Sequence, residues 1–146
     1  MIKMKDFNIF LSGAITCFGK TSFNYGNEWR EELKDRLENM DSKYKVSVTN
    51  PNDYYNFISV EYDSELEVQK FDLDKVKNSD LVIVNFNVRT SIGTSKEIAI
   101  ANEYNIPVIG LNENDLELHP WDINDCRRIF TDKEKLIDYV HKFYLN

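Results

Sequence analysis

A glutamate lies near the start of a predicted helix, in the stretch SIGTSKEIAIANE at residues 91–103. Two interpretations of Glu97 follow from its neighbours. In the first, Thr94 and Glu97 form the T-x-x-E pattern of a capping box, and the glutamate only closes the end of the helix. In the second, the helix follows a central strand of an α/β sheet, where such folds bind ligands, and the carboxylate meets a substrate. The residues alone leave both interpretations open.

The same segment offers groups that bind an oxyanion. The start of a helix has unpaired backbone amides, and Ser91, Gly93 and Thr94 add hydroxyls and close backbone approach. Such an arrangement suits a phosphate or a sugar oxygen. A second carboxylate, Asp72, lies in a charged predicted helix, where an exposed aspartate is the usual case. The pattern alone does not favour Asp72 over Asp74.

Apolar runs and helical periodicities alternate along the chain and predict the elements that position these groups. We expect strands at residues 7–13, 44–51, 80–86, 106–112 and 127–130, and helices at 27–40, 64–79, 94–105 and 132–145. Asn27 is the expected cap of the first helix, and the aromatic segment 52–62 is the expected functional loop. The alternation predicts one α/β domain over residues 1–146. We expect a Rossmann-like or flavodoxin-like parallel sheet with helices on both faces, and its ligand site at the carboxyl ends of the strands.

Composition narrows the class of protein. With 42% hydrophobic and 29% charged residues and no apolar run of bilayer-spanning length, we expect a folded cytoplasmic protein. The net charge of −7 argues against binding long nucleic acid, but a single nucleotide is not excluded, since a few amides and hydroxyls can hold one phosphate. Cys17 and Cys126 lack metal-site spacing, and neither a P-loop nor a Ser-His-Asp pattern is present. We therefore expect no metal site and no cofactor.

Three stretches together resemble a known family. They are IFLSGAI at residues 9–15, DLDKVKNSDLVIVNF at 72–86 and SIGTSKEIAIA at 91–101. In this order and spacing, over roughly residues 7–111, they resemble the nucleoside 2-deoxyribosyltransferase superfamily, which includes the nucleoside 5′-monophosphate N-glycosidases.

The resemblance implies roles for individual residues. Glu97 would be the nucleophile that attacks the anomeric carbon and forms a glycosyl-enzyme intermediate. Asp72 would hold sugar hydroxyls or pass a proton to the leaving base. The turn at Ser12, Gly13 and Ile15 would line the base and the sugar.

Two departures from the family pattern bear on the substrate. Nucleoside transferases of the family usually carry an aspartate where this chain has Ser91, and that carboxylate binds the free 5′-hydroxyl. A serine can donate a hydrogen bond to a phosphate, so Ser91 favours a nucleotide. Many members also have a tyrosine where this chain has Phe10, a change that indicates either a ribonucleotide substrate or a weakened enzyme. Several transferases lend a C-terminal residue to a neighbouring subunit, and Asn124 is the candidate here, which would require a homo-oligomer.

The expected function is cleavage of the N-glycosidic bond in a nucleoside 5′-monophosphate, releasing the free base and a sugar phosphate. The first alternative is exchange of nucleobases by a 2-deoxyribosyltransferase. The second is a non-catalytic nucleotide-binding sensor with the same fold. The expected partner is a small nucleotide or nucleoside, and we expect neither long nucleic acid nor a membrane to be bound.

Overall fold

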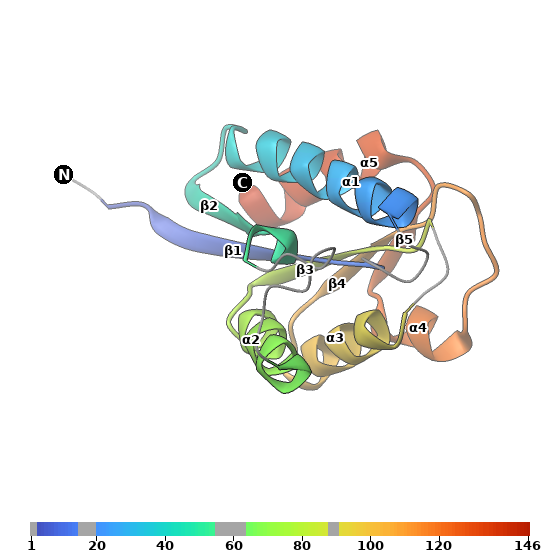
Figure 1. Ribbon diagram of the computed structural model, residues 1–146. Coiled ribbons are helices and arrows are strands. Elements are labelled where there is room, and N and C mark those ends of the chain that lie inside the picture. The colour runs from blue at the N-terminus through green and yellow to red at the C-terminus, as the bar shows by residue number, and fades with distance from the viewer. Residues whose placement is uncertain (1–2, 15–19, 55–63, 88–90) are drawn as a thin grey trace.

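The protein is described by a computed structural model that covers residues 3–14, 20–54, 64–87 and 91–146 (Figure 1). Ile15, Cys17 and residues 55–62 of the expected functional loop lie outside the described residues, as do residues 88–90 after the central strand. No helix in the described ranges has the length and apolar character needed to span a bilayer.

Within the described residues, five parallel strands form one sheet in the order β2-β1-β3-β4-β5. The strands are β1 (Lys5–Ser12), β2 (Tyr44–Thr49), β3 (Leu81–Asn85), β4 (Val108–Leu111) and β5 (Arg128–Phe130). The helices are α1 (Lys20–Glu38), α2 (Glu65–Lys77), α3 (Ile92–Glu103), α4 (Pro120–Asp125) and α5 (Lys133–Val140), with a 3-10 turn η1 (Pro51–Asp53) and a π-helical turn η2 (His141–Leu145). The predicted α/β fold class with a parallel sheet is confirmed.

The helices cover the two faces of the sheet as separate layers. In Figure 1, α1 and α5 lie on one face, and α2, α3 and α4 lie on the other. The strand order reverses between β1 and β3, and α/β sheets bind ligands at such a point, beyond the carboxyl ends of the strands.

Two apolar cores hold these layers together, one on each face of the sheet. Successive side chains of a strand point to opposite faces, so Ile9 and Leu11 enter the core under α1 and α5, whereas Phe10 enters the core with Ile98 of α3. In β3 the residues alternate in the same way and all are buried. This double burial explains the continuous apolar run in the sequence.

The starts of two helices differ from the sequence-based expectation, and one short helix was not expected. α1 begins at Lys20, so Asn27 lies inside the helix and the predicted cap is wrong. Gly26 costs a helix interior only about 1 kcal/mol relative to alanine, which does not end a long helix. α3 begins at Ile92 rather than Thr94, and α4 was not expected, because a six-residue helix is too short to show a period.

Candidate active site

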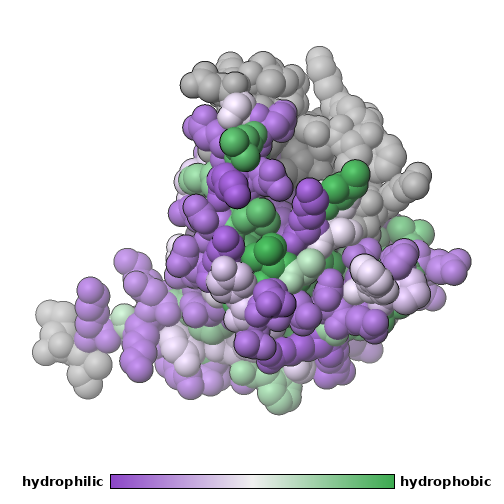
Figure 2. Space-filling view, turned by 90° about the horizontal axis from the view of Figure 1, so that it is seen from below, coloured by the Kyte–Doolittle hydropathy of each residue, from purple (hydrophilic) through white to green (hydrophobic). Residues whose placement is uncertain are grey.

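A pocket of about 300 Å³ lies between α2 and α3. Its lining residues come from these two helices: Glu65, Val68, Gln69, Asp72, Leu73, Ile92, Gly93, Lys96 and Glu97. Figure 2 views the molecule from the side of α2, α3 and α4, and apolar side chains gather in the middle of this face with hydrophilic residues around them. The fold therefore brings Asp72 and Glu97, which are far apart in the sequence, to the wall of one hollow.

Ser91, rather than Thr94 with Glu97, caps α3. The Ser91 hydroxyl oxygen accepts a hydrogen bond from the Thr94 backbone amide at 3.1 Å and lies 2.8 Å from the Thr94 hydroxyl. Thr94 is buried inside the first turn, and Glu97 lies beyond that turn. The capping-box interpretation of Glu97 is wrong, because the helix starts earlier than the pattern suggests.

Glu97 is instead held by the end of the first strand. The Ser12 hydroxyl, fully buried at the end of β1, donates a hydrogen bond to Glu97 Oε1 at 2.7 Å. The pKa of Glu97 is raised to about 8, mainly by burial. The Ser12 hydrogen bond and the Arg30 charge lower this pKa, and the negative charge of Asp72 adds to the increase. The site thus holds a carboxyl group that exchanges its proton near neutral pH.

Asp72 lines the same pocket from α2. Burial raises the pKa of its carboxyl group to about 6, against the opposing charge of Arg30. Its Oδ1 atom is buried and has no hydrogen-bond partner within the described part of the chain. A buried polar atom without a partner is costly, and a sugar hydroxyl or a protonated base would satisfy it. Asp74, which the sequence could not separate from Asp72, is exposed and does not line the pocket.

Arg30 is a site residue that the sequence reasoning missed. Its side chain is fully buried and donates hydrogen bonds to the backbone carbonyls of Gly13 (2.8 Å) and Leu11 (3.4 Å). Its guanidinium also lies over the Trp29 ring, 4.8 Å from the ring centroid. The sequence contained a signal for this burial, because Arg30 lies three positions before Leu33 and so falls on the buried face of α1.

Lys96 was also missed, and it contributes a positive charge to the pocket wall. It is exposed on α3 directly before Glu97. Nothing in the sequence distinguishes it from an ordinary surface lysine of a charged helix. Glu65 places a carboxylate on the opposite wall, on α2.

The remaining predicted site residues are divided between the pocket and its surroundings. Gly93 lines the pocket, and the Gly13 carbonyl accepts the Arg30 hydrogen bond. A Cβ at Gly13 would lie 3.1 Å from Trp29 Cζ2, which explains the glycine. Phe10 is fully buried in the core below α3 and is not among the lining residues.

Asn124 lies away from this pocket. It is exposed on α4 and borders a separate hollow of about 380 Å³, together with Ala99, Asn102, Trp121 and Asp125. The chain therefore does not bring Asn124 to its own Glu97.

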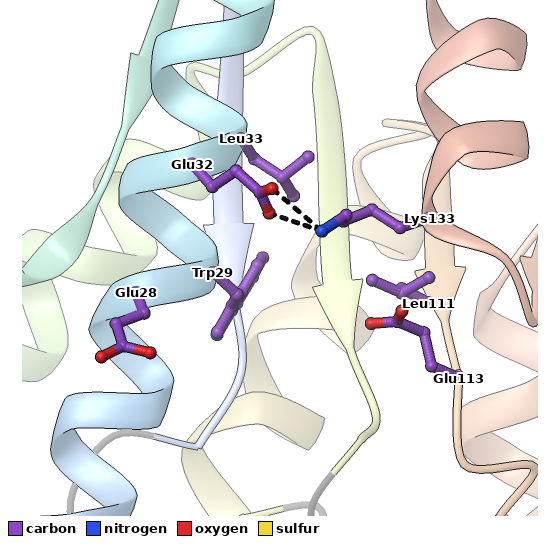
Figure 3. Close-up of a pocket in the computed structure, with 7 residues that line it drawn as sticks. All are labelled: Glu28, Trp29, Glu32, Leu33, Leu111, Glu113 and Lys133. Carbon is purple, nitrogen blue, oxygen red and sulfur yellow. Dashed lines mark hydrogen bonds and ion pairs between the residues drawn. The ribbon is translucent and has the colours of Figure 1, made fainter.

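A further hollow of about 460 Å³ opens on the other face of the sheet, between α1 and the start of α5 (Figure 3). It is lined by Glu28, Trp29, Glu32, Leu33, Leu111, Glu113 and Lys133. Lys133 is already paired with Glu32 at 2.7 Å, as the dashed lines show, and neither Asp72 nor Glu97 reaches this hollow. Within the described ranges, no group of three or more His, Cys, Asp or Glu side chains is placed to hold a metal ion.

Known proteins resemble this chain in structure rather than in sequence. No family model matches the sequence, and no curated protein matches it. The 2-deoxyribosyltransferase of Bacillus psychrosaccharolyticus superimposes with a TM-score of 0.69 at 18% identity, covering 90% of this chain and 91% of that chain. The chain has the 2-deoxyribosyltransferase fold.

Two further structures share this fold. The CMP N-glycosidase of Clostridium botulinum superimposes with a TM-score of 0.58 at 22% identity, over 90% of this chain and 96% of that chain. A conserved protein from Enterococcus faecalis gives a TM-score of 0.71 at 18% identity, over 96% and 99% of the two chains. The resemblance to the nucleoside 2-deoxyribosyltransferase superfamily is thus confirmed at the level of the fold.

Proposed function

We propose that this protein cleaves the N-glycosidic bond of a nucleoside 5′-monophosphate, with Glu97 as the nucleophile. One observation carries the proposal: Glu97 and Asp72, both with raised pKa values, line one pocket between α2 and α3. Paired carboxyl groups on either side of a sugar are the usual machinery for glycosidic bonds. The shared fold with a CMP N-glycosidase and a 2-deoxyribosyltransferase supports the same chemistry.

In the first step Glu97 attacks as the carboxylate. The Ser12 hydrogen bond to Oε1 holds the group, and Oε2 forms a bond to the anomeric carbon. The bond from that carbon to the base breaks, and the base leaves with the electron pair. Asp72, when protonated, donates its proton to the departing base. The products of this step are the free base and a sugar phosphate esterified to Glu97.

Water completes the reaction in the second step. The Asp72 carboxylate takes a proton from the water as the water oxygen bonds to the anomeric carbon. The bond between the sugar and Glu97 breaks and returns the electron pair to the carboxylate. The protein is then in its starting state, and the sugar phosphate leaves.

The start of α3 supports a substrate that carries a phosphate. The backbone amides near Gly93 point out of the first turn of a twelve-residue helix, and such ends attract anions. Lys96 adds a positive charge on the same wall. Ser91 is neutral, and its hydroxyl can donate to a phosphate oxygen, whereas an aspartate there would repel it.

Base exchange is the second candidate function, supported by the fit to a 2-deoxyribosyltransferase with a TM-score of 0.69. The first step is the same, and a second base replaces water in the next step. Incubation with a nucleotide in the presence and absence of a competing base separates the two reactions. A new nucleotide that carries the competing base would indicate transfer, and release of free sugar phosphate would indicate hydrolysis.

The decisive test is a screen of ribo- and deoxyribonucleoside monophosphates for released base, with Glu97→Gln as the variant. We expect the variant to lose at least about a thousandfold in kcat, as nucleophile removal does in other enzymes. Glu103→Gln is the matched control, since Glu103 is exposed on the same helix and lies outside the pocket.

Binding without turnover in the wild type would contradict the enzymatic proposal. It would assign the pocket to a nucleotide sensor, and Glu97→Gln would then leave binding little changed. Equal activity of wild type and Glu97→Gln would show that another group attacks.

The proposal includes a homo-oligomer in which Asn124 serves the neighbouring subunit's pocket. The exposure of Asn124 on α4, away from its own Glu97, supports this arrangement.

A further inference from the structure

A buried arginine reaches the candidate active site from the opposite layer of the molecule. α1 covers one face of the sheet, whereas α2 and α3 lie on the other (Figure 1). Arg30 nevertheless extends from α1 to the end of β1 and is fully buried. Burying a guanidinium is costly unless its charge is matched and its N–H groups are bonded. The buried position of Arg30 therefore depends on the groups that bind its N–H donors and balance its charge.

The hydrogen bonds of Arg30 hold the backbone on both sides of Ser12. Nη2 donates to the Gly13 carbonyl at 2.8 Å, and Nε donates to the Leu11 carbonyl at 3.4 Å. Ser12 lies between these carbonyls, and its hydroxyl donates to Glu97 at 2.7 Å. A continuous path of contacts thus runs from the guanidinium through the turn after β1 to the carboxylate.

Arg30 also carries a buried positive charge that interacts electrostatically with both carboxyl groups of the pocket. Its charge interacts favourably with Glu97 and Asp72, although it does not line the hollow itself. The pKa of Arg30 is lowered by burial to about 10 and remains well above neutrality, so the side chain stays charged. Because the Arg30 side chain is fully buried, solvent screens this interaction only weakly.

Among the described residues, the other charged groups that line the pocket with Glu97 lie on its two helices. Asp72 and Glu65 face it from α2, and Lys96 precedes it on α3. From β1, Ser12 contributes a neutral hydroxyl. Lys96 is exposed and its effect is weakened by water, so the arginine provides the stronger opposition to the two nearby acids.

We propose that Arg30 is a positioning residue of this site, which fixes the turn bearing Ser12, orients the Glu97 side chain through it and favours the ionised form of Glu97. The inference rests on the proposed function for its catalytic consequence. Its structural part, the control of Glu97 by Arg30, is independent of turnover.

Two substitutions separate the charge from the hydrogen bonds. Arg30→Lys keeps the charge but loses the forked donor geometry, and we expect kcat to fall at least about tenfold with KM little changed. Arg30→Gln removes the charge, and we expect a loss of at least about a hundredfold in kcat. In Arg30→Gln the pKa of Glu97 obtained from the pH–rate profile should also be higher by about one unit or more.

Arg36→Gln is the matched control on α1, because Arg36 forms a surface pair with Glu134 outside the pocket. We expect this variant to retain wild-type kcat and the wild-type pH profile. Unfolding curves establish that each variant is folded. If Arg30→Gln does not fold, Arg30→Lys decides, and a wild-type kcat in that variant would overturn the proposal.

A carbon-13 NMR titration of the Glu97 carboxyl group tests the inference without turnover. We expect the pKa of Glu97 to be higher in Arg30→Gln than in the wild type and unchanged in Arg36→Gln. An unchanged titration in folded Arg30→Gln would overturn the role of Arg30. Failure of the wild type to release base, with the shifted titration intact, would overturn only the proposed reaction.

Discussion

The role proposed for Glu97 as a nucleophile and the environment of its side chain oppose each other. A nucleophile must be ionised, but burial raises the pKa of this carboxyl group to about 8. Asp72, which has to be protonated to assist the leaving base, has a pKa of about 6. With the two values about two units apart, the reactive combination is roughly a hundredfold less populated than the one with the proton on Glu97. The low population lowers the rate unless the bound substrate changes the balance.

This arrangement predicts a bell-shaped dependence of kcat/KM on pH, with limbs near 6 and 8 that belong to the pair of carboxyl groups. The acidic limb reports loss of the first proton from the pair, and the basic limb reports loss of the second. Asp72→Asn should abolish the descending limb, because only ionisation of Glu97 then matters. The measurement is initial rates of base release over this pH range, with Asp74→Asn as the control on α2.

A wild-type profile that rises to a plateau above about pH 8 would contradict proton donation by Asp72. It would assign Asp72 to binding sugar hydroxyls as the carboxylate.

The raised pKa of Glu97 also predicts a pH-dependent stability. The carboxyl group loses its proton near 4.5 when the chain is unfolded and at about 8 when it is folded. Between these two pH values the folded protein keeps the Glu97 proton and the unfolded chain has lost it. The contribution of this proton to folding stability is therefore fully present below about pH 4.5 and is lost as the pH rises to about 8. Glu97→Gln cannot ionise and should be more stable than the wild type above about pH 8, by up to a few kcal/mol.

Urea unfolding of both proteins over a pH series measures this difference. It should shrink towards zero below about pH 4.5, and Glu103→Gln should follow the wild type throughout. Parallel stability profiles for wild type and Glu97→Gln would show that Glu97 has an ordinary pKa in the folded protein.

At the scale of the element, α3 joins the fold to the site. It follows the central strand β3, and its first two turns carry Gly93, Lys96 and Glu97 into the pocket. Ser91 ends the preceding connection and caps the helix through the Thr94 amide. One residue therefore determines both where the helix begins and the charge at its N-terminal end.

Ser91→Asp and Ser91→Asn separate these two contributions. Both replacements cap helices well, so each should keep the stability of the wild type within about 0.5 kcal/mol. The aspartate places a negative charge where we propose that the phosphate binds. We expect Ser91→Asp to lower the ratio of nucleotide to nucleoside cleavage by at least about tenfold, and Ser91→Asn to leave it near the wild-type value.

Competition rates with a nucleoside monophosphate and its nucleoside, together with thermal unfolding, measure both effects. If Ser91→Asp and the wild type have the same ratio of nucleotide to nucleoside cleavage, the phosphate does not bind at this end of α3.

At the scale of the whole molecule, the two layers of helices have different tasks. α2 and α3 form the pocket, and α1 supports it from the other face through Arg30. α1 is in turn tied to the start of α5 by Arg36–Glu134 and Lys133–Glu32 ion pairs at 2.6 and 2.7 Å. These pairs are partly exposed, and exposed pairs contribute at most about 1 kcal/mol. The packed cores on the two faces therefore supply most of the rigidity.

The position of Asn124 predicts that two inactive variants restore activity when mixed. If Asn124 serves a neighbouring subunit, a mixed dimer of Glu97→Ala and Asn124→Ala contains one intact site. Random exchange of subunits then returns about a quarter of wild-type activity. The measurement is base release after co-refolding of equal amounts of the two proteins. Activity in Asn124→Ala alone, or no recovery in the mixture, would contradict the shared site.

The sequence by itself determined the class of fold, because hydrophobic period is a local property. The short apolar run of β1 and the continuous apolar run of β3 indicate strands with buried faces, and both patterns can be recognised without knowing the rest of the fold. The sequence also offered Glu97 as a candidate through its place after the central strand, and Asp72 through the resemblance, and the structure places both at one pocket. The boundaries of α1 and α3 could not be predicted as well from the sequence, because a helix cap depends on which hydroxyl and which backbone amide are close in space.

Only the tertiary structure decided what surrounds Glu97. Ser12 precedes it by 85 positions and reaches it because β1 and β3 pair in the middle of the sheet. Asp72 differs from Asp74 only in the direction that its side chain takes from α2, and Arg30 reaches the site from a helix on the opposite face. Charge, burial and hydrogen bonding act over a few ångströms of space, and those distances exist only after the layers have packed.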